Sequence, residues 1–189
     1  MDELPTRSFP TPAAWEAWLA EHHASASGLW LAIGRRGADV ESVTYAEALD
    51  IALRFGWIDG RKGRGEEDGF WMQRFTPRGP RSKWSKVNRA KAEALIGTMR
   101  PAGLREVERA RADGRWDAAY DAQSTATVPD DLRAALDASP AAAEAFAGLD
   151  SRNRYAVLHR VQDAKRPATR ARRIETFVAI LARGERLYP

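Results

Sequence analysis

The sequence contains no cysteine. This absence excludes disulfide bonds, thiolate nucleophiles, iron–sulfur clusters and zinc sites built on thiolates. The histidines His22, His23 and His159 do not stand at the spacing of metal ligands, and the chain has neither a phosphate-binding glycine loop nor a G-x-S-x-G nucleophile elbow. We therefore expect no metal site and no cofactor.

Long apolar runs are also missing. No segment approaches the roughly 18 consecutive apolar residues of a transmembrane helix. Residues 1–7 (MDELPTR) begin with acidic side chains and lack the basic and apolar regions of a secretory signal. We expect a cytoplasmic protein without a membrane span.

The chain of 189 residues is 44% hydrophobic and 30% charged, an ordinary composition for a folded domain. A chain of this length can bury roughly 70% of the surface that its unfolded form exposes. The sequence therefore predicts a stable core, in one compact domain or two small lobes.

Positive charge is concentrated in two segments. Residues 61–91 contain ten basic and three acidic residues, and residues 165–173 contain five basic residues and no acidic one. The rest of the chain carries a net charge of −8, although the whole chain carries +4. Two basic patches on an acidic body indicate an anionic partner.

The first half of the chain alternates between helix and strand patterns. Thr11-Pro12 predicts the start of a helix, and residues 29–33 alternate as a strand does. Residues 44–47 form a capping box at the start of a second helix. Residues 57–59 and 70–75 are predicted to be two strands joined by a polar, glycine-rich loop at 60–69.

The second half is predicted to be helical. Pro101, Pro140 and Pro167 each stand where a helix can begin, and residues 122–126 are the plausible linker. We therefore predict an α+β fold. A small N-terminal α/β lobe with a short sheet (1–90) would be followed by a helical lobe (91–189), with the basic segment at their junction.

The segment 57–88 holds the candidate ligand site. An arginine fork can bind the oxygens of a carboxylate or phosphate, and hydroxyl and amide groups can complete the site. In this hypothesis Arg74 and Arg78 hold the anion, Asp59 is the candidate acid/base, and tryptophans form the walls. The full set of candidate ligand-binding residues is Trp57, Asp59, Arg74, Thr76, Arg78, Ser82, Trp84, Ser85 and Asn88.

A structural interpretation of the same residues stays open. Asp59 would then form an ion pair with Arg74 across the hairpin, while the tryptophans would belong to the core. The second basic patch, Lys165, Arg166, Arg170, Arg172 and Arg173, occupies the start of the last predicted helix, where the macrodipole disfavours cations. Either acids such as Asp163 and Glu175 or a bound anion would offset that charge.

Five strings resemble the YdeI/OmpD-associated family, also named the bacteriocin-protection family. They are residues 42–50 (SVTYAEALD), 56–60 (GWIDG), 74–78 (RFTPR), 82–88 (SKWSKVN) and 164–167 (AKRP). The resemblance extends from Trp15 to Gly184. It implies an association with peptide resistance and an outer-membrane porin, whereas we expect no export signal from residues 1–7.

The leading functional hypothesis is binding of a small anionic or phosphorylated molecule in a basic cleft, with its chemical conversion left open. One alternative is single-stranded nucleic acid, because basic residues interleave with tryptophans. Another is a protein-interaction or stress-protection module without a pocket, which exposed, flat tryptophans would favour. The sequence does not indicate a particular protein partner.

Overall fold

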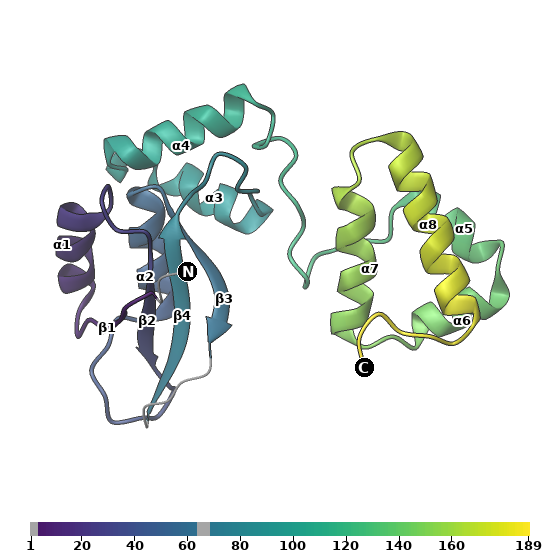
Figure 1. Ribbon diagram of the computed structural model, residues 1–189, viewed down its shortest axis with the longest axis horizontal. Helices are drawn as coiled ribbons and strands as arrows, with labels where there is room; N and C mark the ends of the chain where they lie inside the picture. Colours follow the sequence, from purple (N-terminus) through teal and green to yellow (C-terminus); the bar gives the residue numbers. More distant parts are fainter. Residues whose placement is uncertain (1–3, 64–68) are drawn as a thin grey trace. The chain divides into compact units, whose positions relative to one another are not determined.

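The computed structural model describes residues 4–63 and 69–189 and divides the chain into two compact units. Unit 1 comprises Met1–Trp84 and Asn88–Ala119, and unit 2 comprises Ser85–Val87 and Tyr120–Pro189. The predicted α+β organisation is confirmed, because unit 1 contains the sheet and unit 2 is helical (Figure 1). The sheet-bearing unit extends beyond residue 90, the boundary expected from the sequence.

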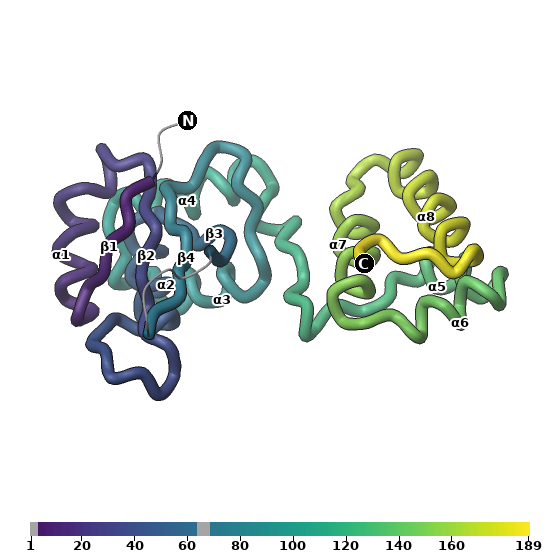
Figure 2. Tube along the Cα trace, turned by 60° about the horizontal axis from the view of Figure 1, so that its bottom comes forward, coloured from purple at the N-terminus to yellow at the C-terminus, as the bar shows by residue number. Residues whose placement is uncertain are grey.

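Unit 1 is built on a four-stranded sheet in the order β1-β2-β4-β3 (Figure 2). Its strands are β1 (Thr6–Ser8), β2 (Leu29–Gly34), β3 (Trp57–Gly63) and β4 (Phe70–Pro77). β1 runs parallel to β2, and the other neighbouring pairs are antiparallel. The sequence predicted β2, β3 and β4 but not the three-residue β1. Residues 64–68 of the expected hairpin loop lie outside the described residues.

Four α-helices accompany the sheet: α1 (Pro12–His22), α2 (Tyr45–Arg54), α3 (Lys86–Leu95) and α4 (Pro101–Ala112), with a short 3-10 helix, η1 (Ile96–Thr98), before α4. The predicted capping box begins α2, since the Thr44 amide donates to Glu47 Oε2 (2.9 Å) and the Glu47 amide donates to Thr44 Oγ1 (3.3 Å). Gly103 lets α4 approach the end of α2, because a Cβ there would clash with the Arg54 carbonyl.

The core of unit 1 lies on one face of the sheet. Leu29, Leu31 and Phe75 point from the strands into this core and are fully buried, as is Trp15 of α1. Each large apolar side chain buried in this way stabilises the fold by about 1.5–3 kcal/mol. In Figure 1 the helices lie beside and behind the sheet, so no helix among the described residues of this unit covers its other face.

Unit 2 contains α5 (Asp130–Asp137), α6 (Pro140–Ala147), α7 (Ser151–Asp163) and α8 (Pro167–Ala182). Leu132, Phe146, Val157 and Phe177 form the centre of its core. The C-terminal segment returns along α7 (Figures 1 and 2), where the Tyr188 amide donates to Asn153 Oδ1 (2.9 Å). None of the described helices is long and apolar enough to cross a membrane.

Candidate functional site

The residues predicted to form one ligand site occupy several distinct places. Trp57, Asp59 and Asn88 lie on the helix-covered side of the sheet, Arg78, Ser82 and Trp84 belong to the loop after β4, and Arg74 and Thr76 point to the opposite face. Ser85 forms an isolated backbone bridge with Tyr120 and groups with unit 2. The alternation of side chains along the strands causes this separation.

On the helix-covered side, Asp59 belongs to a polar cluster. Asp59 Oδ2 accepts a hydrogen bond from the Tyr45 hydroxyl (2.8 Å), and Oδ1 accepts one from Asn88 Nδ2 (3.4 Å). The strand register pairs Asp59 with Phe75, so the ion pair with Arg74 that the sequence allowed is not formed. Trp57 is fully buried and its indole donates to the His23 carbonyl (3.1 Å), as the structural interpretation expected of a core residue.

In the loop after β4, the side chain of Arg78 is buried. Arg78 is only 5% exposed, and its guanidinium carbon lies 3.5 Å from the centroid of the Trp84 ring. Arg78 Nη1 also donates to the Lys83 carbonyl (3.3 Å), closing the loop on itself. Ser82 Oγ accepts from the Gly79 amide (3.0 Å) within the same turn. These contacts use Arg78 and Ser82 to shape the loop.

Two arginines that the sequence analysis did not single out donate hydrogen bonds to carbonyls of this loop. Arg115 Nη1 donates to the Ser82 carbonyl (2.7 Å), and Arg109 Nη2 donates to the Arg78 carbonyl (3.5 Å). Each also pairs with an acid of its own segment, Arg109 with Glu106 and Arg115 with Asp113 (2.8 Å). The hydrogen bond from Arg115 holds the pKa of Asp113 below its usual value.

The opposite side of the sheet, here called the open face, consists of the strand residues that point away from the core. They are Thr6, Ser8, Trp30, Ala32, Gly34, Ile58, Gly60, Gly63, Phe70, Met72, Arg74 and Thr76, together with Arg61, which lies at the register shift of β3 with its guanidinium over the Trp30 ring. Ala32 and Met72 are buried, yet neither belongs to the hydrophobic core cluster. The buried side chains of the open face are therefore separate from the hydrophobic core on the other side of the sheet.

Trp30 lies across the open face. A Cβ placed on Gly63 of β3 would lie 2.9 Å from Cζ3 of Trp30 and 3.1 Å from Cβ of Met72, although Trp30 belongs to β2 on the far side of β4. The stem of Arg74 lies beside Gly60, where a Cβ would meet its Cδ at an ordinary contact distance of 3.6 Å. The glycine at position 63 is thus the one that lets the Trp30 ring approach β3.

The open face is basic. The Arg61 guanidinium carbon lies 5.7 Å from the centroid of the Trp30 ring, and Arg74 stands opposite Trp30 in the strand register. Neither arginine forms an ion pair with a described acidic residue, and Nε of Arg74 is buried without a hydrogen-bond partner among those residues. Asp59, the acid in these four strands, points to the other side.

The five cations of the second basic patch differ in their contacts. Arg170 pairs with Asp131 (2.5 Å) and donates to the Val161 carbonyl (2.8 Å), while Arg173 donates to the Arg160 carbonyl and lies 3.8 Å from Asp163. These bonds add donors to carbonyls in the last turn of α7, where the Val161 carbonyl also accepts from the Ala164 amide (3.2 Å). The other three cations of the patch, Lys165, Arg166 and Arg172, are exposed.

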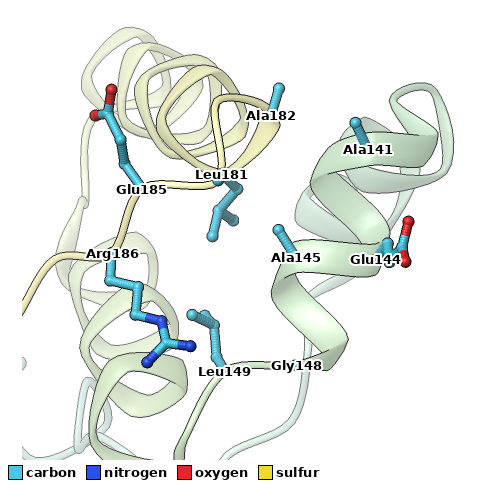
Figure 3. Close-up of a pocket in the computed structure, with 10 residues that line it drawn as sticks. Ala141, Glu144, Ala145, Gly148, Leu149, Leu181, Ala182, Glu185 and Arg186 are labelled. Atoms are coloured by element: carbon cyan, nitrogen blue, oxygen red, sulfur yellow. The ribbon is translucent and has the colours of Figure 1, made fainter.

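Unit 2 has a groove of about 400 Å³ between α6, α8 and the segment after α8 (Figure 3). Ala145, Leu149 and Leu181 line its apolar part, and Glu144 and Arg186 add charge. None of the residues predicted from the sequence as ligand-binding lines this groove. It lies outside the basic segments that carried the sequence hypothesis.

The histidines take part in packing. His23 Nδ1 lies 2.8 Å from the Leu19 carbonyl, and His22 packs edge-on against Trp18. Within residues 4–63 and 69–189, no group of three or more His, Asp or Glu side chains could hold a metal ion.

The sequence analysis missed Trp30, Arg109 and Arg115 as important residues. A signal for Trp30 was present, because it alternates with Leu29 and Leu31 and so had to leave the core face. None of the seven tryptophans is an exposed side chain, since each is buried or half-buried. The exposed, flat tryptophans that would favour an interaction module are therefore not found.

Two family models match the chain. Residues 7–106 match a family described as "Domain of unknown function (DUF8412)", and residues 125–184 match the family "Bacteriocin-protection, YdeI or OmpD-Associated". The suspected YdeI/OmpD-associated relationship is thus confirmed in the C-terminal part, which includes residues 164–167. The other four strings that suggested it lie within residues 7–106. No curated protein and no solved structure gives a significant match.

Proposed function

This chain belongs to the DUF8412 family, whose function is unknown, and we propose that its N-terminal unit binds a phosphorylated ligand on the open face of the sheet. The observation that carries the proposal is the arrangement of Arg61 and Arg74 around the half-buried ring of Trp30, without an acidic strand residue on that face. The proposal narrows the hypothesis of a small anionic or phosphorylated ligand to a defined surface.

Arginine suits this role because its planar guanidinium can donate two parallel hydrogen bonds to phosphate oxygens. Arg61 is exposed, and Arg74 is half-buried with its stem against Gly60. Partial burial restricts the Arg74 side chain, so less conformational entropy is lost when it binds an anion. Thr76 and Thr6 add hydroxyl groups on the same face, which can donate further hydrogen bonds to phosphate oxygens.

The proposed binding does not use every residue of the sequence hypothesis. Arg78, Ser82 and Trp84 shape and fill the loop after β4, and Asp59 lies on the other side of the sheet, bonded to Tyr45. The proposal is therefore one of binding, with no catalytic role for Asp59. In this proposal Arg74 and Thr76 still contact the ligand. Arg61 replaces Arg78 as the second arginine that holds the anion.

Calorimetric titration with tripolyphosphate at low ionic strength tests the proposal. We expect Arg74→Gln and Arg61→Gln each to weaken binding about tenfold, which corresponds to roughly 1.4 kcal/mol per lost arginine contact. Both variants should keep the unfolding free energy of the wild type within about 0.5 kcal/mol, because the two side chains lie outside the core.

Two matched controls are available in unit 1. Arg111 is an exposed arginine whose guanidinium carbon lies 5.1 Å from the Trp116 ring centroid, and Lys62 lies in the same hairpin as Arg61 but 4.8 Å over Trp71. Arg111→Gln and Lys62→Gln remove the same charge away from the open face, so we expect affinity within about twofold of the wild type. Equal losses in controls and test variants, or no binding by the wild type, would refute the proposal.

A further inference from the structure

We infer that the phosphorylated ligand of the open face is single-stranded nucleic acid, with a base stacked on Trp30 and the backbone phosphates held by Arg61 and Arg74. This inference rests on the proposed function and adds the class of ligand. The juxtaposition that supports it is an indole ring that reaches across a basic sheet face to Gly63, with no described helix of the same unit in front of it (Figure 1).

Trp30 offers a stacking surface of the right kind. Its ring reaches from β2 across β4 to Gly63, where the missing Cβ leaves room for it, and the ring is half-buried, so part of it remains accessible. Met72, the register partner of Gly63, stands on the same face at that end of the ring. Every nucleobase has a π-face, so stacking on a tryptophan binds bases without requiring one particular sequence.

The charges beside the ring fit a polyanion. Arg61 and Arg74 flank Trp30 from β3 and β4, and neither is paired with a described acid. Phosphates on either side of a stacked base could therefore meet a guanidinium each. A guanidinium can also stack on a base, and that of Arg61 lies 5.7 Å from the centroid of the Trp30 ring.

The hydroxyl groups along the face extend the site beyond one nucleotide. Thr6 stands opposite Trp30, and Ser8 stands opposite Ala32 on the neighbouring β1, and both side chains are exposed. Thr76 lies two residues beyond Arg74 on β4. Contacts on both sides of the ring favour a strand that passes over the sheet, because they extend the site along the face beyond the ring.

The inference is tested by comparing ligands that differ in one feature. An eight-residue oligo(dT), an abasic oligonucleotide of the same length and charge, and a duplex would each be titrated into the full chain, with tripolyphosphate as the ligand that has no base. Intrinsic tryptophan fluorescence reports stacking and anisotropy of a labelled oligonucleotide reports affinity. We expect the order oligo(dT), then abasic strand, then duplex, because paired bases are not available for stacking.

Variants of the open face separate stacking from charge. Trp30→Ala should weaken oligo(dT) binding about 5- to 150-fold and leave tripolyphosphate binding unchanged, while Trp30→Phe should retain most of the affinity. Arg61→Gln and Arg74→Gln should each reduce the slope of log affinity against log salt by about 0.7, the value for one phosphate contact on a single strand. Arg111→Gln serves as the charge control.

The outcomes distinguish the inference from the proposed function. Equal affinity for the abasic strand and oligo(dT), with Arg74-dependent binding of tripolyphosphate, would overturn the nucleic-acid inference and leave the proposed function standing. If, in addition, the wild-type protein did not bind tripolyphosphate, both the nucleic-acid inference and the proposed function would be refuted. Because the abasic comparison uses the wild-type protein, the inference remains testable even where a Trp30 variant is unstable.

Discussion

Unit 1 presents an arginine above a tryptophan in several places, and two of these places differ in what the arginine can still do. In the loop after β4, Arg78 is 5% exposed, lies 3.5 Å from the Trp84 ring centroid and donates to the Lys83 carbonyl. On the open face, Arg61 is exposed and lies 5.7 Å from the Trp30 ring centroid. The first arginine stabilises the fold, and the second is accessible to a ligand.

This comparison shows why a count of charges does not locate a binding site. Residues 61–91 carry a net charge of +7, and Arg61, Arg74 and Arg78 all belong to that segment. A guanidinium that donates to buried carbonyls is already part of the structure, and removing it leaves those carbonyls unsatisfied. Only the arginines whose donors face solvent can donate hydrogen bonds directly to an anion.

The largest expected effect is on stability and follows from the buried member of the pair. Arg78→Ala should lower the free energy of unfolding by about 2–4 kcal/mol, because it uncovers the Trp84 ring and removes the donor to the Lys83 carbonyl. Arg61→Gln, its counterpart on the open face, should change it by less than about 0.5 kcal/mol. Urea denaturation followed by tryptophan fluorescence measures the unfolding free energy of both variants. Similar losses in the two variants would show that the two arginines do not differ in their contribution to stability.

A smaller effect extends the comparison to unit 2, within helix α8. Arg170→Ala should destabilise the packing of α5 against α8 by about 1 kcal/mol, because it removes the bond to Asp131 and the donor to the Val161 carbonyl. Arg172→Ala, an exposed neighbour in the same helix, is the control and should have little effect. Amide hydrogen exchange in α5 and at the end of α7 reports the difference, and equal protection in both variants would contradict it.

The smallest expected effect is a pH dependence of stability that arises from the pair of Arg170 and Asp131. The hydrogen bond from Arg170 holds the pKa of the Asp131 carboxyl below its ordinary value of 3.8. A carboxyl with a lowered folded-state pKa stabilises the fold above its unfolded pKa, and this contribution is lost as the pH falls through the folded value. Because the Asp131 side chain is 47% exposed, the contribution amounts to only a few tenths of a kcal/mol.

Comparing the wild type with Asp131→Asn across acid denaturation checks this dependence. The two proteins should differ in stability at neutral pH and converge as the pH falls through the lowered folded-state pKa of Asp131. A difference that stays constant down to the lowest pH would show that the pair acts through packing alone.

Much of the secondary structure could be predicted because its signals are local. The capping box at Thr44 and Glu47 begins α2 as expected, and Pro101, Pro140 and Pro167 each open a helix. β1 was missed because its three residues are exposed and offer no alternating pattern, and its pairing with β2 depends on a partner more than twenty residues away.

The candidate site was harder to predict than the fold. That Arg74 and Thr76 share a face follows from the alternation of one strand. That Asp59 points to the other face depends on the register between two strands, which shifts between Asp59 and Lys62. The contribution of Trp30 depends on Gly63 of another strand, and no pattern within either segment connects these two residues.

The sequence by itself determined where the helices start, which residues are apolar enough to form a core, and that basic residues gather at 61–91 and 165–173. Only the tertiary structure decided which of those cations remain accessible. Hydrogen bonds between guanidinium groups and distant carbonyls, such as Arg115 with Ser82, form only after the chain has folded. Their partners are fixed by three-dimensional proximity, whereas a local sequence pattern reflects only neighbours along the chain.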